Sequence, residues 1–183
     1  LLSLEDDLLK QRLTRIREIE ALGYRAYGQR FEFTHTVPDI LAAYGAKTAE
    51  ELAPEVRVRI AGRLMTLRHM GKAGFAHLQQ NGERLQIYVK KDAVGERDFA
   101  LFKLVDLGDI LGVEGYLFRT RTGELSIHAE KLEFLSKTLL SMPEKFHGLE
   151  DVETRYRQRY LDLIANPEVR KVFVTRARIV SSL

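Results

Sequence analysis

The feature that most constrains the fold is a change in apolar spacing near residue 56. Before Gly23 the apolar residues recur at helical spacing, whereas Val56, Val58 and Ile60 alternate with arginines, as in a half-buried strand. Further segments of strand type follow, and one helical segment interrupts them. The strands are expected at residues 56–67, 75–80, 84–90, 110–119 and 125–135, and the short helix at 98–105.

This order of three strands, a helix and two strands is that of the OB-fold, a five-stranded barrel that commonly binds oligonucleotides. Two turn signals support it. Asn81-Gly82 is typical of a two-residue hairpin, and Thr122-Gly123 separates the last two strands. We therefore expect a mainly β protein with helical flanks, divided into an N-terminal helix and linker (1–55), the barrel (56–136) and a C-terminal helical part (137–183).

Helices are expected on both sides of the barrel. The apolar pattern predicts a helix at 4–22, with Gly23 as its stop, and shorter helices at 37–44 and 48–52. After the barrel the pattern returns to helical spacing over 151–165.

A further helix is expected after Asn166-Pro167, a good pair for an N-cap and first helical position. It continues to Leu183 without a stop signal, and the chain lacks an initiator Met. From these two observations we expect a piece of a longer protein.

Composition excludes several classes of protein. There is no cysteine, so disulfides and thiolate zinc sites are ruled out, and no apolar run approaches the ~20 residues that span a bilayer. The five histidines show no metal-ligand spacing and no nucleophile partner. We expect a cytosolic protein with no membrane contact, no metal site and no catalytic residue in this chain.

Positive charge is concentrated in one part of the chain, although the net charge is only +3. Between residues 57 and 91 the only acid is Glu83. A local excess of this kind can attract a polyanion, or it can be an ordinary solvated surface, and charge does not decide between the two. The basic residues of this stretch are Arg57, Arg59, Arg63, Arg68, Lys72, Arg84, Lys90 and Lys91.

Side-chain alternation identifies an unusual aromatic residue on the outer face of the barrel. Ala76 and Leu78 are expected to point to the core, which places Phe75 outward, where alternation predicts solvent. Unpaired bases stack on such rings beside a positive groove. The alternative is a ring covered by a loop or a flanking helix. The same alternation places His77, Gln79, Gln86, Tyr88, Glu124, Ser126 and His128 outward.

Three arginines alternate along the predicted C-terminal helix, in Arg155-Tyr156-Arg157-Gln158-Arg159. They could form a solvated helix face, contact phosphates or meet an acidic partner surface.

Two stretches of the chain resemble the lysyl-tRNA synthetase family, and together they run from about residue 57 to the end. The first, shared in outline with aspartyl- and asparaginyl-tRNA synthetases, comprises Ala61-Gly62-Arg63, Met70-Gly71-Lys72, Phe75, Leu85-Gln86-Ile87-Tyr88-Val89, Asp106-Leu107-Gly108-Asp109 and Thr122-Gly123-Glu124-Leu125-Ser126. The second, which favours the lysyl members, comprises Lys145-Phe146-His147-Gly148-Leu149 and Arg155-Tyr156-Arg157-Gln158-Arg159-Tyr160-Leu161-Asp162-Leu163. Residues 1–55 resemble the family only loosely.

The resemblance implies that the barrel binds the anticodon loop of lysine tRNA, whose central base is uridine. Phe75 would stack on that base, and Gln86 would hydrogen-bond its edge. Arg68 would donate to an anticodon carbonyl, and Glu124 would accept from a base N–H. Further contacts to the tRNA backbone or to an interface are implied for His77, Lys72, Arg155, Arg157 and Arg159.

For the complete enzyme the resemblance implies a homodimer that attaches lysine to its tRNA through a lysyl-adenylate, with ATP and Mg²⁺. The helix after Pro167 resembles the family's first motif, the dimer-interface helix. The motifs that bind ATP and lysine are absent, so the chain is expected to bind tRNA without catalysing the reaction.

Two other functions remain open. One is a stand-alone OB protein that binds single strands, which would explain the barrel, the basic stretch and Phe75 but not the helical residues after the barrel. The other is a synthetase of the aspartyl or asparaginyl type.

Overall fold

The computed structural model describes residues 4–27, 30–52, 55–140, 149 and 151–183. Contacts within the chain define two compact units, Leu1–Ser141 and Met142–Leu183. The three-part division expected from the sequence stays a prediction. None of the described helices is long and apolar enough to cross a membrane.

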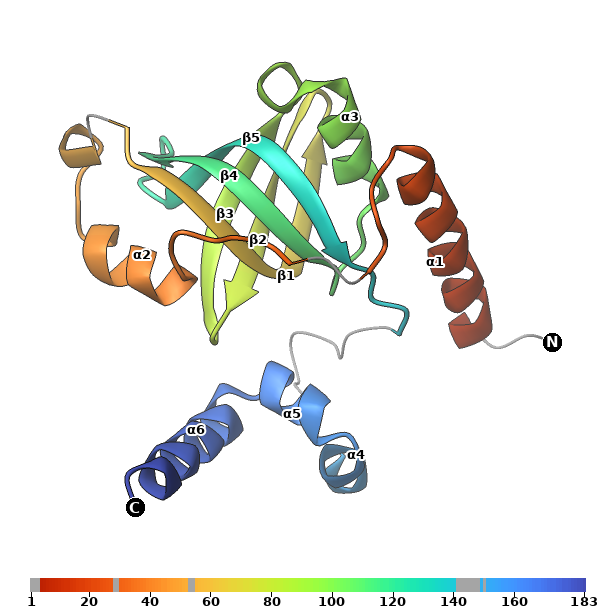
Figure 1. The fold of residues 1–183 in the computed structure, drawn as a ribbon, viewed down its shortest axis with the longest axis vertical. Coiled ribbons are helices and arrows are strands. Elements are labelled where there is room, and N and C mark those ends of the chain that lie inside the picture. The colour runs from red at the N-terminus through yellow and green to blue at the C-terminus, as the bar shows by residue number, and fades with distance from the viewer. Residues whose placement is uncertain (1–3, 28–29, 53–54, 141–148, 150) are drawn as a thin grey trace. The chain divides into compact units, whose positions relative to one another are not determined.

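The first unit is built on five strands that close into a barrel (Figure 1). They are β1 (Arg57–Met70), β2 (Ala73–Gln80), β3 (Glu83–Lys90), β4 (Ile110–Arg119) and β5 (Leu125–Ser136). Around the barrel they follow the order β1-β2-β3-β5-β4, with only the β3–β5 pair parallel. The predicted OB-fold is confirmed. The hairpin predicted at Asn81-Gly82 joins β2 and β3, and both residues have the positive φ (53° and 90°) that a type I′ turn requires.

A bulge in β1 reverses the direction of its side chains halfway along. In the pairing of β1 with β2, Leu64 lies opposite Leu78 and Thr66 lies opposite His77, so Met65 has no partner. Ile60 and Leu64, at even positions before the bulge, are fully buried in the core. After it the even positions face outward, because one extra residue shifts the alternation by one.

Three helices accompany the barrel: α1 (Leu4–Ala21), α2 (Val37–Tyr44) and α3 (Lys91–Leu104). α1 and α2 agree with their predicted ranges. The segment expected to form a helix at 48–52 contains only a short 3-10 helix (Glu50–Leu52). α3 begins earlier than predicted and is interrupted at Gly95, whose φ of 83° is not helical.

α3 lies over one end of the barrel, next to α1 (Figure 1). Its Phe102 is fully buried and packs on Gly74 of β2. A Cβ atom at Gly74 would lie 2.5 Å from the Phe102 ring, so this position requires glycine. This contact packs α3 closely against β2 of the barrel.

A buried cluster of charges joins α1 to the barrel. The Lys137 ammonium donates to Asp106 (2.5 Å) and to Asp109 (2.7 Å), and the side chains of Lys137 and Asp109 are fully buried. Arg15 of α1 pairs with Asp106, and Arg12 of α1 donates to the backbone carbonyl groups just after Lys137. Burial lowers the pKa of Lys137 and raises that of Asp109, while their mutual attraction opposes both shifts.

The second unit contains three helices: α4 (Val152–Arg157), α5 (Arg159–Ala165) and α6 (Pro167–Ser181). The prediction of one helix over 151–165 was wrong, because Gln158 (φ −116°, ψ 57°) leaves the helical region and separates α4 from α5. Asn166 occupies the predicted N-cap position of α6, but its side chain makes no cap and donates instead to Asp162. Asp162 contacts residues on both sides of the break at Gln158, namely Arg155 and Arg159.

The Lys137 cluster gives a prediction for stability. Lys137→Met would leave the fully buried Asp109 and the partly exposed Asp106 without their shared cation, and breaking a buried ion pair typically destabilises a fold by about 3–5 kcal/mol. Urea unfolding followed by circular dichroism measures this change. The matched control is Lys131→Met at an exposed position on β5, which should stay within about 0.5 kcal/mol of the original protein. Equal stabilities for the two variants would show that the cluster does not hold the fold together.

Candidate nucleic-acid interface

An open pocket of about 710 Å³ lies on the outer surface of the barrel, with walls from β1 to β4 and from the turn between β4 and β5. The structure brings together here all four residues that the resemblance implies for base recognition: Arg68, Phe75, Gln86 and Glu124. Sequence reasoning did not assign the other lining residues to the site. They are Met70, Ala73, Tyr88, Phe118, Thr120, Arg121 and Thr122.

Aromatic rings form one wall of this pocket. Phe75 and Tyr88 contact each other across β2 and β3, with ring centroids 4.9 Å apart. Phe118 on β4 lies 6.1 Å from Tyr88, and His128 on β5 contacts both of these rings. All four side chains are partly exposed. Outward alternation already placed Tyr88 on this face, and the same rule applied to β4 would have found Phe118 next to the buried Leu117.

A chain of hydrogen bonds connects polar side chains at the other side of the pocket. The Gln86 amide donates to Glu124 Oε2 (2.8 Å), and the Ser126 hydroxyl donates to Gln86 Oε1 (2.9 Å). His77 Nε2 lies 3.0 Å from Glu124 Oε1, and Thr66 Oγ1 lies 2.7 Å from His77 Nδ1. Ser126 is buried although its side chain faces this outer network. The carboxylate of Glu124 is thus held on both of its oxygens.

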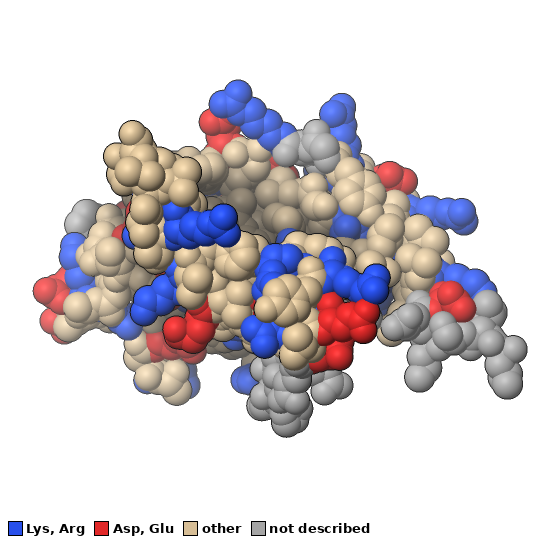
Figure 2. Space-filling model, turned by 90° about the horizontal axis from the view of Figure 1, so that it is seen from below, with Lys and Arg blue, Asp and Glu red and all other residues tan. Residues whose placement is uncertain are grey.

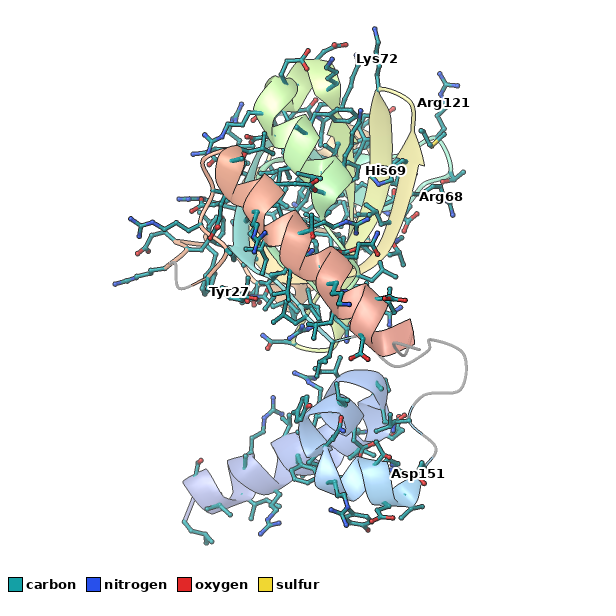
Figure 3. All side chains as sticks on the ribbon, turned by 90° about the vertical axis from the view of Figure 1, so that its right-hand side faces the viewer. Tyr27, Arg68, His69, Lys72, Arg121 and Asp151 are labelled. Atoms are coloured by element: carbon teal, nitrogen blue, oxygen red, sulfur yellow. The ribbon has the colours of Figure 1, made fainter. Side chains whose placement is uncertain are left out.

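Three basic side chains at or near the pocket are exposed and make no ion pair with any residue that the structure describes: Arg68, Lys72 and Arg121. Figure 3 shows Arg68 and Arg121 projecting from the same side of the barrel, with Lys72 at the tip of the β1–β2 hairpin. Burial and the charge of nearby Lys103 lower the pKa of His69, which disfavours a positive charge on its ring. The local field is therefore positive through these three residues.

Most other cations of the basic stretch are already neutralised by acids. Arg57 forms a two-bond pair with Glu130 (2.6 and 3.3 Å), and Arg59 lies within 3.6 Å of carboxylates on β4 and β5. Lys90 and Lys91 pair with acids at the start of α3. The face drawn in Figure 2 likewise shows basic and acidic side chains interspersed. Whether a cation of the basic stretch is paired therefore depends on which acids the fold places beside it, and not on the number of charges nearby in the sequence.

The three alternating arginines of the second unit are engaged within that unit. Arg155 and Arg159 both pair with Asp162, and Arg157 pairs with Glu153. Burial raises the pKa of Asp162, but hydrogen bonds from Asn166 and Arg155 and the charges of both arginines outweigh it and lower the pKa. Contacts of these arginines with phosphate or with a partner stay a prediction.

No group of three or more acidic or histidine side chains that could hold a metal ion occurs in the part of the chain that the structure describes. His147 lies outside the described residues. The groups present at the pocket suit binding of an unpaired base: rings for stacking, an amide and a carboxylate for a base edge, and cations for phosphate.

Comparison with known proteins defines the class of this barrel. Residues 58–135 match the family of OB-fold nucleic acid binding domains. This match agrees with the strand order of the barrel, and residues 58–135 form an OB-fold.

Over nearly its whole length the chain is similar to bacterial lysine–tRNA ligases. It is 50% identical over 179 residues to the enzyme of Halalkalibacterium halodurans, 49% over 181 residues to that of Bacillus thuringiensis and 48% over 179 residues to that of Bacillus subtilis. The matches cover 97–98% of this chain but 36% of each relative, so the chain spans about a third of their length. The resemblance predicted from the sequence is confirmed.

Proposed function

We propose that this chain binds the anticodon loop of lysine tRNA through the pocket on its OB barrel, as the N-terminal part of a lysine–tRNA ligase. The observation that carries the proposal is the convergence of Phe75, Gln86, Glu124 and Arg68 on one open pocket. These residues come from three strands and a turn. The relatives are named as lysine–tRNA ligases, which is the reason for proposing tRNA as the ligand.

Each wall of the pocket suits one part of an unpaired nucleotide. Phe75 and Tyr88 present apolar ring surface on which a base can stack. Gln86 and Glu124 offer a donor and acceptors for the edge of a base, with uridine as the expected central base. Arg68, Lys72 and Arg121 supply positive charge for carbonyl oxygens and phosphates.

For the complete protein we propose attachment of lysine to its tRNA through an adenylate, with ATP and Mg²⁺, in a cytosolic homodimer. In this proposal the present chain contributes tRNA binding, and the parts of the relatives that it does not span contribute the chemistry. Purified chain should then bind tRNA without supporting lysine-dependent exchange of pyrophosphate into ATP.

A stand-alone single-strand-binding protein would use the same rings and cations. The two functions differ in selectivity, because stacking on a ring accepts any base whereas hydrogen bonds to a base edge do not. Competition between the lysine anticodon stem-loop and generic single strands distinguishes them. Stem-loops with the aspartate or asparagine anticodon test the related synthetase types in the same assay.

Phe75→Ala should weaken binding of the lysine anticodon stem-loop by roughly 1–3 kcal/mol, because it removes a stacking surface. Fluorescence anisotropy with a labelled stem-loop measures the affinity, and circular dichroism checks that the variant is folded. Phe33→Ala is the matched control, since Phe33 is exposed and does not line the pocket. Unchanged affinity in folded Phe75→Ala would assign Phe75 to packing.

Gln86→Ala and Glu124→Ala should each reduce discrimination between the cognate stem-loop and one with a changed central base. Affinity for the non-cognate RNA should change less, because base-edge contacts specify whereas phosphate contacts position. Glu18→Ala on the exposed surface of α1 is the control for loss of a carboxylate. Equal weakening of both RNAs would show that these residues only position the loop.

A further inference from the structure

We propose that His77 and Thr66 are positioning residues that fix the Glu124 carboxylate for base recognition, and that His77 itself does not contact RNA. This inference rests on the proposed function of the pocket. Its evidence lies in the bulge of β1, the direction of the protons along the hydrogen-bond chain and the exposure of the ring.

The bulge at Met65 brings the first member of the chain into place. Before it, even-numbered residues of β1 face the core, and Thr66 would continue that series. The extra residue turns Thr66 to the outer face, directly opposite His77. There its hydroxyl oxygen accepts the backbone N–H of His77 (3.0 Å) and lies 2.7 Å from Nδ1 of the same residue.

The contacts of the His77 ring determine which of its two nitrogens carries the proton. Nε2 lies 3.0 Å from Glu124 Oε1, so a bare lone pair on Nε2 would face a carboxylate oxygen and be repelled. Nε2 therefore donates. In the neutral ring Nδ1 must then accept a hydrogen bond. The Thr66 hydroxyl can donate it, because the His77 backbone N–H uses only a lone pair of the hydroxyl oxygen and leaves its proton available. Thr66 thus stabilises the tautomer that donates to Glu124.

The second carboxylate oxygen is held from the other side. Gln86 donates to Oε2 of Glu124, and Ser126 in turn donates to the Gln86 carbonyl, which sets the orientation of this amide. Each oxygen of Glu124 has one protein donor and keeps a lone pair for a ligand. The side chain is 47% exposed and lines the pocket. Fixing it before RNA arrives reduces the entropy lost on binding.

His77 is poorly placed to touch RNA directly. Its side chain is only 29% exposed, both ring nitrogens have protein partners, and it does not line the pocket. Its expected role as a tRNA backbone contact is replaced in this proposal by a role that acts through Glu124.

The test compares Thr66→Val, which keeps the shape but loses the hydroxyl, with Thr66→Ser, which keeps the hydroxyl. Discrimination is the ratio of dissociation constants for stem-loops with the changed and the cognate central base. Thr66→Val should lower this ratio about threefold to tenfold, the effect typical of one lost hydrogen bond, and Thr66→Ser should retain it. Thr14→Val, at an exposed hydroxyl on α1, is the control for the substitution itself.

A second readout reports the ring of His77 without any RNA. Long-range ¹H–¹⁵N spectra should show the Nε2–H form in the original protein and a smaller share of that form in Thr66→Val, where Glu124 alone still favours it. An Nδ1–H ring in the original protein, unchanged discrimination in Thr66→Val, or equal weakening of both RNAs would each overturn the positioning role. Failure of the original protein to bind any stem-loop would instead overturn the proposed function, and the tautomer spectra would still decide whether Thr66 orients His77.

Discussion

The bulge in β1 is the constraint on which the barrel and its pocket both depend. A strand of a closed barrel must send alternate side chains inward, and β1 does so with Ile60 and Leu64 up to Met65. The unpaired Met65 then shifts the alternation of side chains by one residue. The same strand therefore fills the core before the bulge and places pocket residues on the outer surface after it. Arg68, a pocket residue, and Thr66, which orients His77, both owe their direction to this shift.

Charge pairing then selects which cations remain available to a ligand. The basic stretch between residues 57 and 91 contains eight arginines and lysines, and half of them are held by carboxylates: Arg57, Arg59, Lys90 and Lys91. The arginines of the second unit are engaged in the same way around Asp162. The exposed Arg68, Lys72 and Arg121 keep their charge free of acidic partners within the described residues. These three cations can attract a polyanion to the edge of the barrel where the pocket lies.

Strand order and much of the pocket follow from local sequence. Period-two alternation is a direct consequence of strand geometry, so it placed Phe75 and Gln86 outward without knowledge of the fold, and Glu124 by extension from the adjacent start of β5. The bulge could not be predicted, because alternation along β1 carries no sign of one unpaired residue, which appears only in the pairing with β2. By strict alternation from Ile60, Arg68 would point to the core.

Other features were also beyond local sequence. Arg121 enters the site from a turn, where alternation says nothing about direction. The break at Gln158 accompanies a cluster around Asp162, whose partners Arg155 and Asn166 lie seven and four residues away. Spacings of four and seven residues are also those of neighbours on one face of a continuous helix, so this pattern by itself predicts no break. The measurement that tests the central claim most directly is photo-crosslinking of a lysine anticodon stem-loop carrying 5-iodouridine at its central position. A crosslink to Phe75 or Tyr88 is predicted, whereas crosslinks confined to residues 151–183 would contradict the assignment of the pocket as the anticodon site.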